Sequence, residues 1–330
     1  MIPISYNGVP EEYFHFISKF RKKIQGWYKK GVMGNARTKV TVCDECMLFF
    51  KLLLRKDYLE KIMITKASDL PRIIEIVESK FPQLKNDREH PNGDHSELYN
   101  CLNKAFYILG YKNVNFPKHK ITESLGLNAC PYCNQEEIIY QEIQAEDGSL
   151  CRIMNSELDH FYPKSRVPYL AVSLFNLVPC GSICNGGTGK HEKDTYAEGL
   201  VNPYILREAN GIEFRLDIVS NGVLDYETFN QACKIKIITN DQTLVPNRNI
   251  FNIAGRYKYE LDKAKRVWTS HKKIESEGYK TEIERFSKLV GSKMTIEEWL
   301  DAELDINSSN YNKAKLSKFA MDIWNQLNNH

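Results

Sequence analysis

The sequence lacks the features that would place the protein in a membrane or outside the cell. No apolar run approaches the roughly 18 residues that a membrane-spanning helix needs. The first residues, MIPISYNGVPEEYF, have neither the basic segment nor the apolar segment of a signal peptide. We therefore predict a cytoplasmic protein that does not associate with membranes.

No tail or arm of the chain carries an excess of charge of one sign either. The 330 residues contain 45 Lys and Arg against 42 Asp and Glu, which gives a net charge of +3. There is no basic tail, no internal repeat and no low-complexity linker. A net charge this close to zero permits a nucleic-acid partner without requiring one, so the function has to be inferred from individual motifs.

Nine cysteines are the most informative residues that are present. A reducing cytoplasm disfavours disulfides, so closely spaced cysteines point first to metal binding. Cys130 and Cys133 form a C-x2-C pair in the turn-forming segment CPYCN, and Cys180 and Cys184 form a C-x3-C pair in PCGSICN. Two such pairs supply the four thiolates of a closed, tetrahedral site, so we predict that these four cysteines bind a structural Zn²⁺.

The remaining cysteines are expected in apolar surroundings. Cys101, Cys151 and Cys233 stand alone in the sequence and are expected to be buried. Cys43 and Cys46 share the C-x2-C spacing, but their segment, VTVCDECMLFFKLLL, is apolar and has no turn residues. We expect a packing role for this pair, with a redox or metal role as the alternative.

Hydrophobic periodicity predicts an α+β protein in three parts. Residues 1–122 are expected to form a helical domain, because apolar residues recur at three- and four-residue intervals, as in EEYFHFISKFRKKIQGWYKK. Ser68 is expected to cap the helix in DLPRIIEIVES. Residues 123–205 combine a hairpin, formed by EEIIYQEI and SLCRIM, with the cysteine pairs. Residues 206–330 begin with strands in IEFRLDIV and KIKIIT, separated by the turn signal SNGV, and end in helices.

One stretch of the middle segment carries the residues that phosphodiester hydrolysis needs. The reaction requires a base that activates water and a positive charge that stabilises the phosphorane. Asp159 offers a carboxylate and Asn185 an amide oxygen, the hard ligands that Mg²⁺ prefers. The imidazole of His160 can accept the proton from water. Asp159 and His160 alternate along a predicted strand, so both serve one site only if a second strand pairs with the first and a helix packs across it.

The order of these residues resembles that of the HNH endonucleases, also called the His-Me finger or ββα-metal group. The matching residues are Asp159–His160 in DH, Asn176 in NL, and Cys184–Asn185 in CN, followed by Lys190. The resemblance implies a central ββα-metal finger between helical flanks, held together by the four-cysteine zinc site. It also implies that His160 is the general base and that Asn176 braces the hairpin. Asp159 and Asn185 would bind a catalytic divalent ion such as Mg²⁺.

A narrower resemblance covers residues 128–204. The run CPYCN…LDHFYPKSRVPYLAVSLFNLVPC…CN looks like the HNH nucleases of Septu and retron-associated antiphage systems, which are encoded beside an ABC-type or SMC-like ATPase. The resemblance implies an effector nuclease of an antiphage complex. Its expected partners are nucleic acid, with DNA favoured over RNA, and an ATPase subunit of this type.

One departure from the family's pattern leaves the third metal ligand open. The family has C-N-x-x-K on the finger helix, whereas this chain has CNGGTGKH, and its three glycines disfavour an immediate helix. Asn185 is the expected ligand, and His191 is the alternative if the helix begins late. Lys164, in the segment YPKS, is placed to contact a phosphate, although an exposed loop lysine would give the same pattern.

Two other functions fit parts of the same pattern. The cysteine pairs alone would suit a non-catalytic zinc ribbon that binds nucleic acid or docks to protein. The intact Asp159–His160 pair argues against this reading, because such a module needs no base beside a carboxylate. A stand-alone restriction or homing nuclease would need DNA-reading elements, and neither flank has the signature of a recognition helix.

Overall fold

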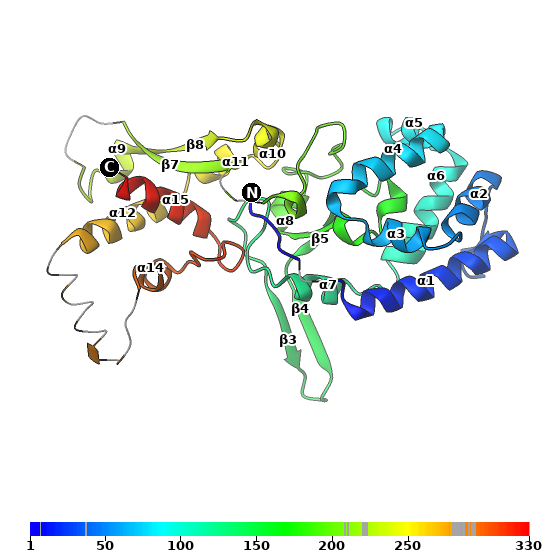
Figure 1. The fold of residues 1–330 in the computed structure, drawn as a ribbon, viewed down its shortest axis with the longest axis horizontal. Coiled ribbons are helices and arrows are strands. Elements are labelled where there is room, and N and C mark those ends of the chain that lie inside the picture. Colours follow the sequence, from blue (N-terminus) through cyan, green and yellow to red (C-terminus); the bar gives the residue numbers. More distant parts are fainter. Residues whose placement is uncertain are drawn as a thin grey trace. The chain divides into compact units, whose positions relative to one another are not determined.

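The computed structural model describes all residues except 7, 37, 208, 210, 220–223, 277, 279–280, 282–284, 286–287, 290, 292–294 and 330. The described residues form an α+β protein in which the strands pair as two-stranded antiparallel sheets among many helices (Figure 1). The chain divides into two compact units, each assembled from separate stretches of sequence. Within the described ranges, no helix combines the length and apolar character needed to cross a membrane. The turn expected in SNGV lies outside the described residues.

The larger unit comprises Ile4–Gly126 and Tyr140–Ile205. Its helices are α1 (Glu11–Lys30), α2 (Asp44–Leu53), α3 (Tyr58–Ile64), α4 (Leu70–Lys80), α5 (Pro82–Glu89), α6 (Glu97–Leu102), the π-helix η2 (Asn103–Tyr111), α7 (Lys118–Leu125) and α8 (Ser182–Asn185), with short 3-10 turns η1 (Ala67–Asp69), η3 (Pro168–Leu170), η4 (Leu174–Asn176) and η5 (Pro203–Ile205). Its strands are β1 (Val32–Met33), β2 (Val40–Thr41), β3 (Tyr140–Gln144), β4 (Leu150–Met154), β5 (Glu157–His160) and β6 (Leu177–Cys180).

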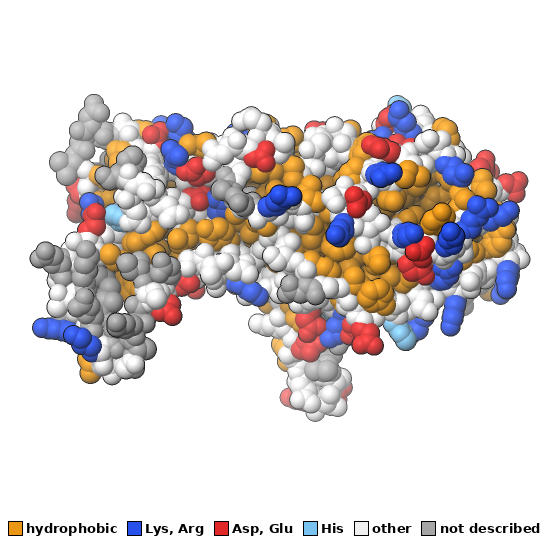
Figure 2. Space-filling model, in the orientation of Figure 1, with side chains coloured by type: hydrophobic (Ala, Val, Ile, Leu, Met, Phe, Trp, Pro, Cys, Tyr) orange, Lys and Arg blue, Asp and Glu red, His pale blue; other side chains and the backbone are white. Residues whose placement is uncertain are grey.

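Helix α1 forms where the apolar spacing predicts it. Its apolar stripe is buried, whereas basic side chains of the helix, such as Lys19, lie at the surface. Figure 2 shows Lys and Arg side chains gathered over this part of the unit. The cap predicted for α4 is wrong: Ser68 lies inside the 3-10 turn η1, and Asp69 occupies the N-cap position. The chain already turns helically before α4 begins, so the hydroxyl of Ser68 does not cap it.

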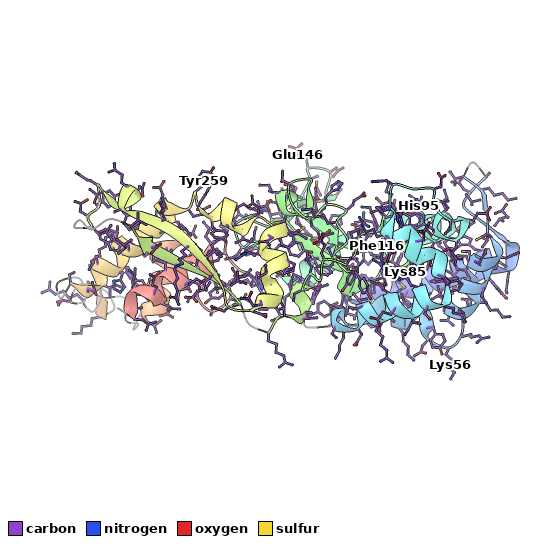
Figure 3. All side chains as sticks on the ribbon, turned by 90° about the horizontal axis from the view of Figure 1, so that it is seen from above. Lys56, Lys85, His95, Phe116, Glu146 and Tyr259 are labelled. Carbon is purple, nitrogen blue, oxygen red and sulfur yellow. The ribbon has the colours of Figure 1, made fainter. Side chains whose placement is uncertain are left out.

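The predicted hairpin of the middle segment is confirmed. β3 and β4 pair antiparallel from Tyr140↔Met154 to Gln144↔Leu150. The hairpin extends away from the helices of its unit (Figure 1), and Glu146 lies at its tip (Figure 3). Cys151 lies on β4 and is exposed, so its predicted burial is wrong. A strand of an isolated hairpin leaves both of its faces in contact with water.

The smaller unit comprises Met1–Pro3, Leu127–Ile139 and Leu206–His330. Its elements are β7 (Ile212–Ile218), α9 (Phe229–Ala232), β8 (Cys233–Thr239), η6 (Gln242–Leu244), α10 (Val245–Ile250), α11 (Ile253–Tyr257), α12 (Leu261–Glu275), α14 (Ile296–Leu304) and α15 (Ser317–Asn328). β7 and β8 form the second predicted strand pair. Helix α15 covers the other edge of β7, because Asp322 and Gln326 accept hydrogen bonds from the strand's backbone amides at 3.0 and 2.8 Å.

Candidate active site

The candidate site is built on the strand pair β5–β6 of the larger unit. The strands pair antiparallel, with Asp159 opposite Val178 and His160 opposite Leu177. The connection between them is folded back by the turns η3 and η4. Asp159 and His160 therefore stand at the end of β5, where the chain leaves the sheet.

Asn176 ties the two ends of this connection together. Its Oδ1 accepts a hydrogen bond from the backbone amide of Tyr162 at 2.7 Å. Its Nδ2 donates to the carbonyl oxygens of Tyr162 and Leu170, both at 3.1 Å. The side chain is fully buried, so each of these bonds replaces one that water would otherwise make. Asn176 thereby holds the backbone that follows His160.

The His160 ring is buried and oriented by a single backbone group. Its Nε2 lies 2.9 Å from the carbonyl oxygen of Ala171. A carbonyl can only accept, so Nε2 carries the proton and Nδ1 is the acceptor nitrogen of a neutral ring. Burial, followed by the positive charge of Lys164, lowers the pKa of His160 to about 3. The imidazole is therefore neutral at physiological pH, as a general base must be.

Asp159 is buried and forms an ion pair with Lys190. The Nζ of Lys190 lies 3.0 Å from Asp159 Oδ1, and both side chains are almost fully buried. The same ammonium group donates to the carbonyl oxygen of His160 at 2.8 Å and to that of His191 at 3.3 Å. Lys190 thus neutralises the carboxylate and fixes the backbone next to the imidazole.

The segment CNGGTGKH forms a short helix and a tight loop. Helix α8 has four residues, ends with Asn185 and is followed by an extended Gly186. The loop then packs so closely that a Cβ at Gly189 would clash with the carbonyl oxygen of Cys184. The sequence predicted that the three glycines disfavour a helix directly after Asn185, and none begins between residues 186 and 191. The one helical turn lies before the glycines instead. The structure shows a strand pair and one helical turn here, not the full ββα finger.

Asn185 and His191 both line the site, but they lie on different elements: Asn185 ends helix α8, and His191 lies on the loop that follows it. The Asn185 side-chain amide donates to a carboxylate oxygen of Glu157, on the same strand as Asp159. His191 is exposed and has a left-handed backbone conformation with φ 46°. Asn185 is therefore held by a partner, whereas His191 stands on the loop.

These side chains line one open pocket of about 420 Å³. The predicted residues that it brings together are Asp159, His160, Lys164, Asn185 and His191. The other charged or aromatic residues that line it include Tyr107, Tyr111, Lys118, Glu157, Lys190 and Glu192. The pocket combines a neutral imidazole, carboxylate and amide oxygens that could bind a metal ion, and several lysines. These are the groups expected for binding and hydrolysing a phosphodiester.

The two cysteine pairs belong to different units. In the smaller unit, the ligand atoms of Cys130, Cys133 and Glu136 lie within 4.8 Å of one another. A tight turn supports them, because the amide of Cys130 donates to the carbonyl of Glu136 at 2.8 Å. In the larger unit, Cys180 ends β6 and Cys184 lies in α8, and both are buried. Within the smaller unit, the thiols of Cys130 and Cys133 and the carboxylate of Glu136 are ligand types that can bind zinc.

Comparison with known proteins gives one informative similarity. No family model and no solved structure matches the chain. The chain is similar to a Septu protein. This relative is Septu protein PtuB of Bacillus thuringiensis, 24% identical over 152 residues that cover 42% of this chain and 52% of the relative. The chain thus spans about half the length of the curated relative that it matches.

Sequence reasoning missed several residues of the pocket. Glu157 had a signal, because it precedes Asp159 by two positions and so shares its face of the strand. The sequence comparison matched Lys190 to the family pattern but assigned it no role. Its ion pair with Asp159 depends on the path of the glycine-containing loop between Asn185 and Lys190. Tyr107 and Tyr111 lie about fifty residues before Asp159 in the chain, and the sequence gives no signal that they approach it.

Proposed function

We propose that the chain is a metal-dependent HNH-type endonuclease that hydrolyses phosphodiester bonds as the effector of an antiphage system. The observation that carries this proposal is the His160 imidazole, neutral and fixed through Nε2, in a pocket that also presents Asp159 and Asn185. The similarity to a Septu protein supports the biological setting. A purely docking module would need none of these three side chains in one pocket.

In this proposal His160 accepts the proton of the attacking water at Nδ1. The bond from Nε2 to the Ala171 carbonyl sets the ring's orientation and strengthens as the ring becomes positively charged. Asn176 holds the strand connection around the base. The lysines of the pocket would stabilise the charge that develops on the phosphorane.

The donor set of the pocket fits a hard divalent cation. Asp159, Glu157 and Asn185 present carboxylate and amide oxygens to the same pocket. Asp159 and Asn185 would hold Mg²⁺ or a similar ion, with His191 as the alternative to Asn185. When bound, the ion would polarise the scissile phosphate. Lys190, which already neutralises Asp159, would keep this carboxylate oriented.

We further propose that Cys130, Cys133, Cys180 and Cys184 bind one structural Zn²⁺. The sequence spacing supports this set, and all four side chains are buried. Glu136 is a weaker candidate ligand, because its carboxylate forms an ion pair with Arg256 at 3.1 Å. The zinc would stabilise the fold.

The proposed partners follow from the resemblance and the similarity. DNA is the proposed substrate ahead of RNA, and an ABC-type or SMC-like ATPase is the proposed partner subunit. Co-expression with a candidate ATPase of this type tests the second of these. A stable complex is expected on size-exclusion chromatography, whereas two separate peaks would contradict the proposal.

Cleavage of labelled DNA and RNA in Mg²⁺ tests the proposed activity. The unsubstituted chain, with its ATPase partner present, should cleave DNA, and EDTA should stop the reaction. Asp159→Asn keeps the shape of the side chain but removes the charged ligand, so cleavage should fall by at least about a hundredfold. Cleavage that persists in EDTA would show that the activity does not use a metal.

A further inference from the structure

Three lysines beside the candidate site rest on the faces of two tyrosines. The ammonium groups of Lys112 and Lys164 lie 4.9 and 5.2 Å from the ring centre of Tyr107. That of Lys118 lies 4.1 Å from the ring centre of Tyr111. The two rings are stacked, with their centres 5.9 Å apart. We call these five residues the tyrosine–lysine patch.

The patch lies directly against the proposed general base. The ring of Tyr111 meets the ring of His160 edge-on, with 4.4 Å between their centres. The hydroxyl of Tyr111 donates to the carbonyl oxygen of Leu158 on β5 at 3.2 Å. Lys118 and Lys164 both line the pocket that contains His160. An anion bound by these lysines would therefore lie next to the site of hydrolysis.

The lysines of the patch form no ion pair with the residues that the structure describes. Within the part of the chain that the structure describes, no carboxylate oxygen lies within 4.0 Å of the ammonium groups of Lys112, Lys118 or Lys164. Lys190, in the same pocket, is by contrast paired with Asp159 at 3.0 Å. Burial and the charge of Lys112 lower the pKa of Lys118. Like charges held this close favour the binding of an anion.

The tyrosines lie on a segment with an unusual backbone conformation. Tyr107 and Tyr111 lie on η2, a nine-residue π-helix, a rare conformation that often occurs at functional sites. A Cβ at Gly110 would lie only 3.0 Å from a side-chain carbon of Val172. Val172 follows Ala171, whose carbonyl orients His160. Glycine thus lets the π-helix pack against the side chain of Val172, the residue next to the carbonyl group that orients the base.

We propose that the tyrosine–lysine patch binds the phosphate groups of the nucleic-acid backbone on either side of the scissile bond. The lysines contact the phosphates. The tyrosines are positioning residues, because their rings hold the ammonium groups in place through cation–π attraction. This inference rests on the proposed nuclease function and adds the residues that hold its substrate.

Salt-dependent binding tests the lysines without cleavage. Binding of a fluorescein-labelled DNA duplex would be measured in EDTA over a range of NaCl concentrations. The slope of log K against log[NaCl] is negative, and each lost phosphate contact should reduce its magnitude by about 0.9. Lys112→Gln, Lys118→Gln and Lys164→Gln should each reduce it by about one, and the triple variant by more than two. Lys56→Gln is the matched control, since Lys56 is exposed and points away from its unit (Figure 3).

Substitutions of the tyrosines should change the affinity for DNA without changing its salt dependence. Tyr107→Leu leaves all charges in place, so the slope should stay unchanged while affinity at low salt falls about two- to fivefold. Tyr107→Phe keeps the ring and should restore the affinity. In cleavage assays the loss in Tyr107→Leu should appear in KM and not in kcat.

The outcomes separate the patch from the nuclease proposal. A triple lysine variant that is folded and binds DNA with the slope of the unsubstituted chain would overturn the patch alone. Equal affinity in Tyr107→Leu and the unsubstituted chain would overturn the positioning role. If the unsubstituted chain binds no nucleic acid at any salt concentration, both the patch and the proposed function are wrong.

Discussion

Replacing Lys190 by methionine should destabilise the larger unit strongly. The substitution keeps the length and apolar character of the side chain but removes the charge that neutralises buried Asp159. It also removes the donor to the carbonyl oxygen of His160. Breaking a buried ion pair from one side costs about 3–5 kcal/mol, because the remaining charge is left without a partner. This is a large part of the roughly 5–15 kcal/mol that stabilises a typical domain.

The same reasoning predicts rescue by a second substitution. Asp159→Asn removes the buried charge, so the double variant Asp159→Asn/Lys190→Met should recover about half of the lost stability or more. Urea unfolding gives the overall stability, and amide hydrogen exchange of peptides from β5 and β6 reports the local effect. Lys193→Met is the matched control, because Lys193 is exposed on the same segment. Wild-type stability in Lys190→Met, or no rescue in the double variant, would refute the argument.

Three further predictions concern the metals and the base. Cys180→Ser should lose bound zinc and solubility together, and a well-folded, zinc-free variant with full activity would argue against the cysteine site. Asn185→Ala should abolish Mg²⁺-dependent cleavage while His191→Ala only weakens it, because Asn185 is held by Glu157 and His191 is exposed. The opposite order of Mg²⁺ affinities would assign the ligand to His191. Because the pKa of His160 is lowered from 6.5 to about 3, the base stays unprotonated as pH falls through 6.5. Cleavage rates between pH 8 and pH 5 should therefore show no loss with a midpoint near 6.5.

Local patterns carried the parts of the fold that were predicted correctly. The stripe of α1, the hairpin β3–β4 and the strands β7 and β8 follow from residue periods of 3.6 and 2. Burial of Cys101 and Cys233 was also predicted correctly, whereas Cys151 is exposed because its hairpin stands apart from the helices of its unit. Burial depends on what a strand packs against, which a local pattern does not contain.

In the candidate site, too, some features follow from the local sequence and others depend on tertiary packing. Asp159, His160 and Asn185 were found because they lie close together in the sequence, in an order that resembles a known family. The pairing of Asp159 with Lys190 depends on a glycine-containing loop whose path no spacing rule gives. The approach of Tyr111 to His160 depends on a π-helix and on the close packing of Gly110. Contacts of this kind are set by tertiary packing and have no local signal in the sequence.

The central claim is that His160 is the base of a metal-dependent nuclease. The direct measurement is the DNA cleavage rate of His160→Ala in Mg²⁺, beside His90→Ala as a control for an exposed histidine outside the pocket. We predict that His160→Ala stays folded and loses about 10²–10⁴-fold in rate, as is typical when a general base is removed. His90→Ala should cleave at the rate of the unsubstituted chain. Cleavage by His160→Ala at that same rate would contradict the account.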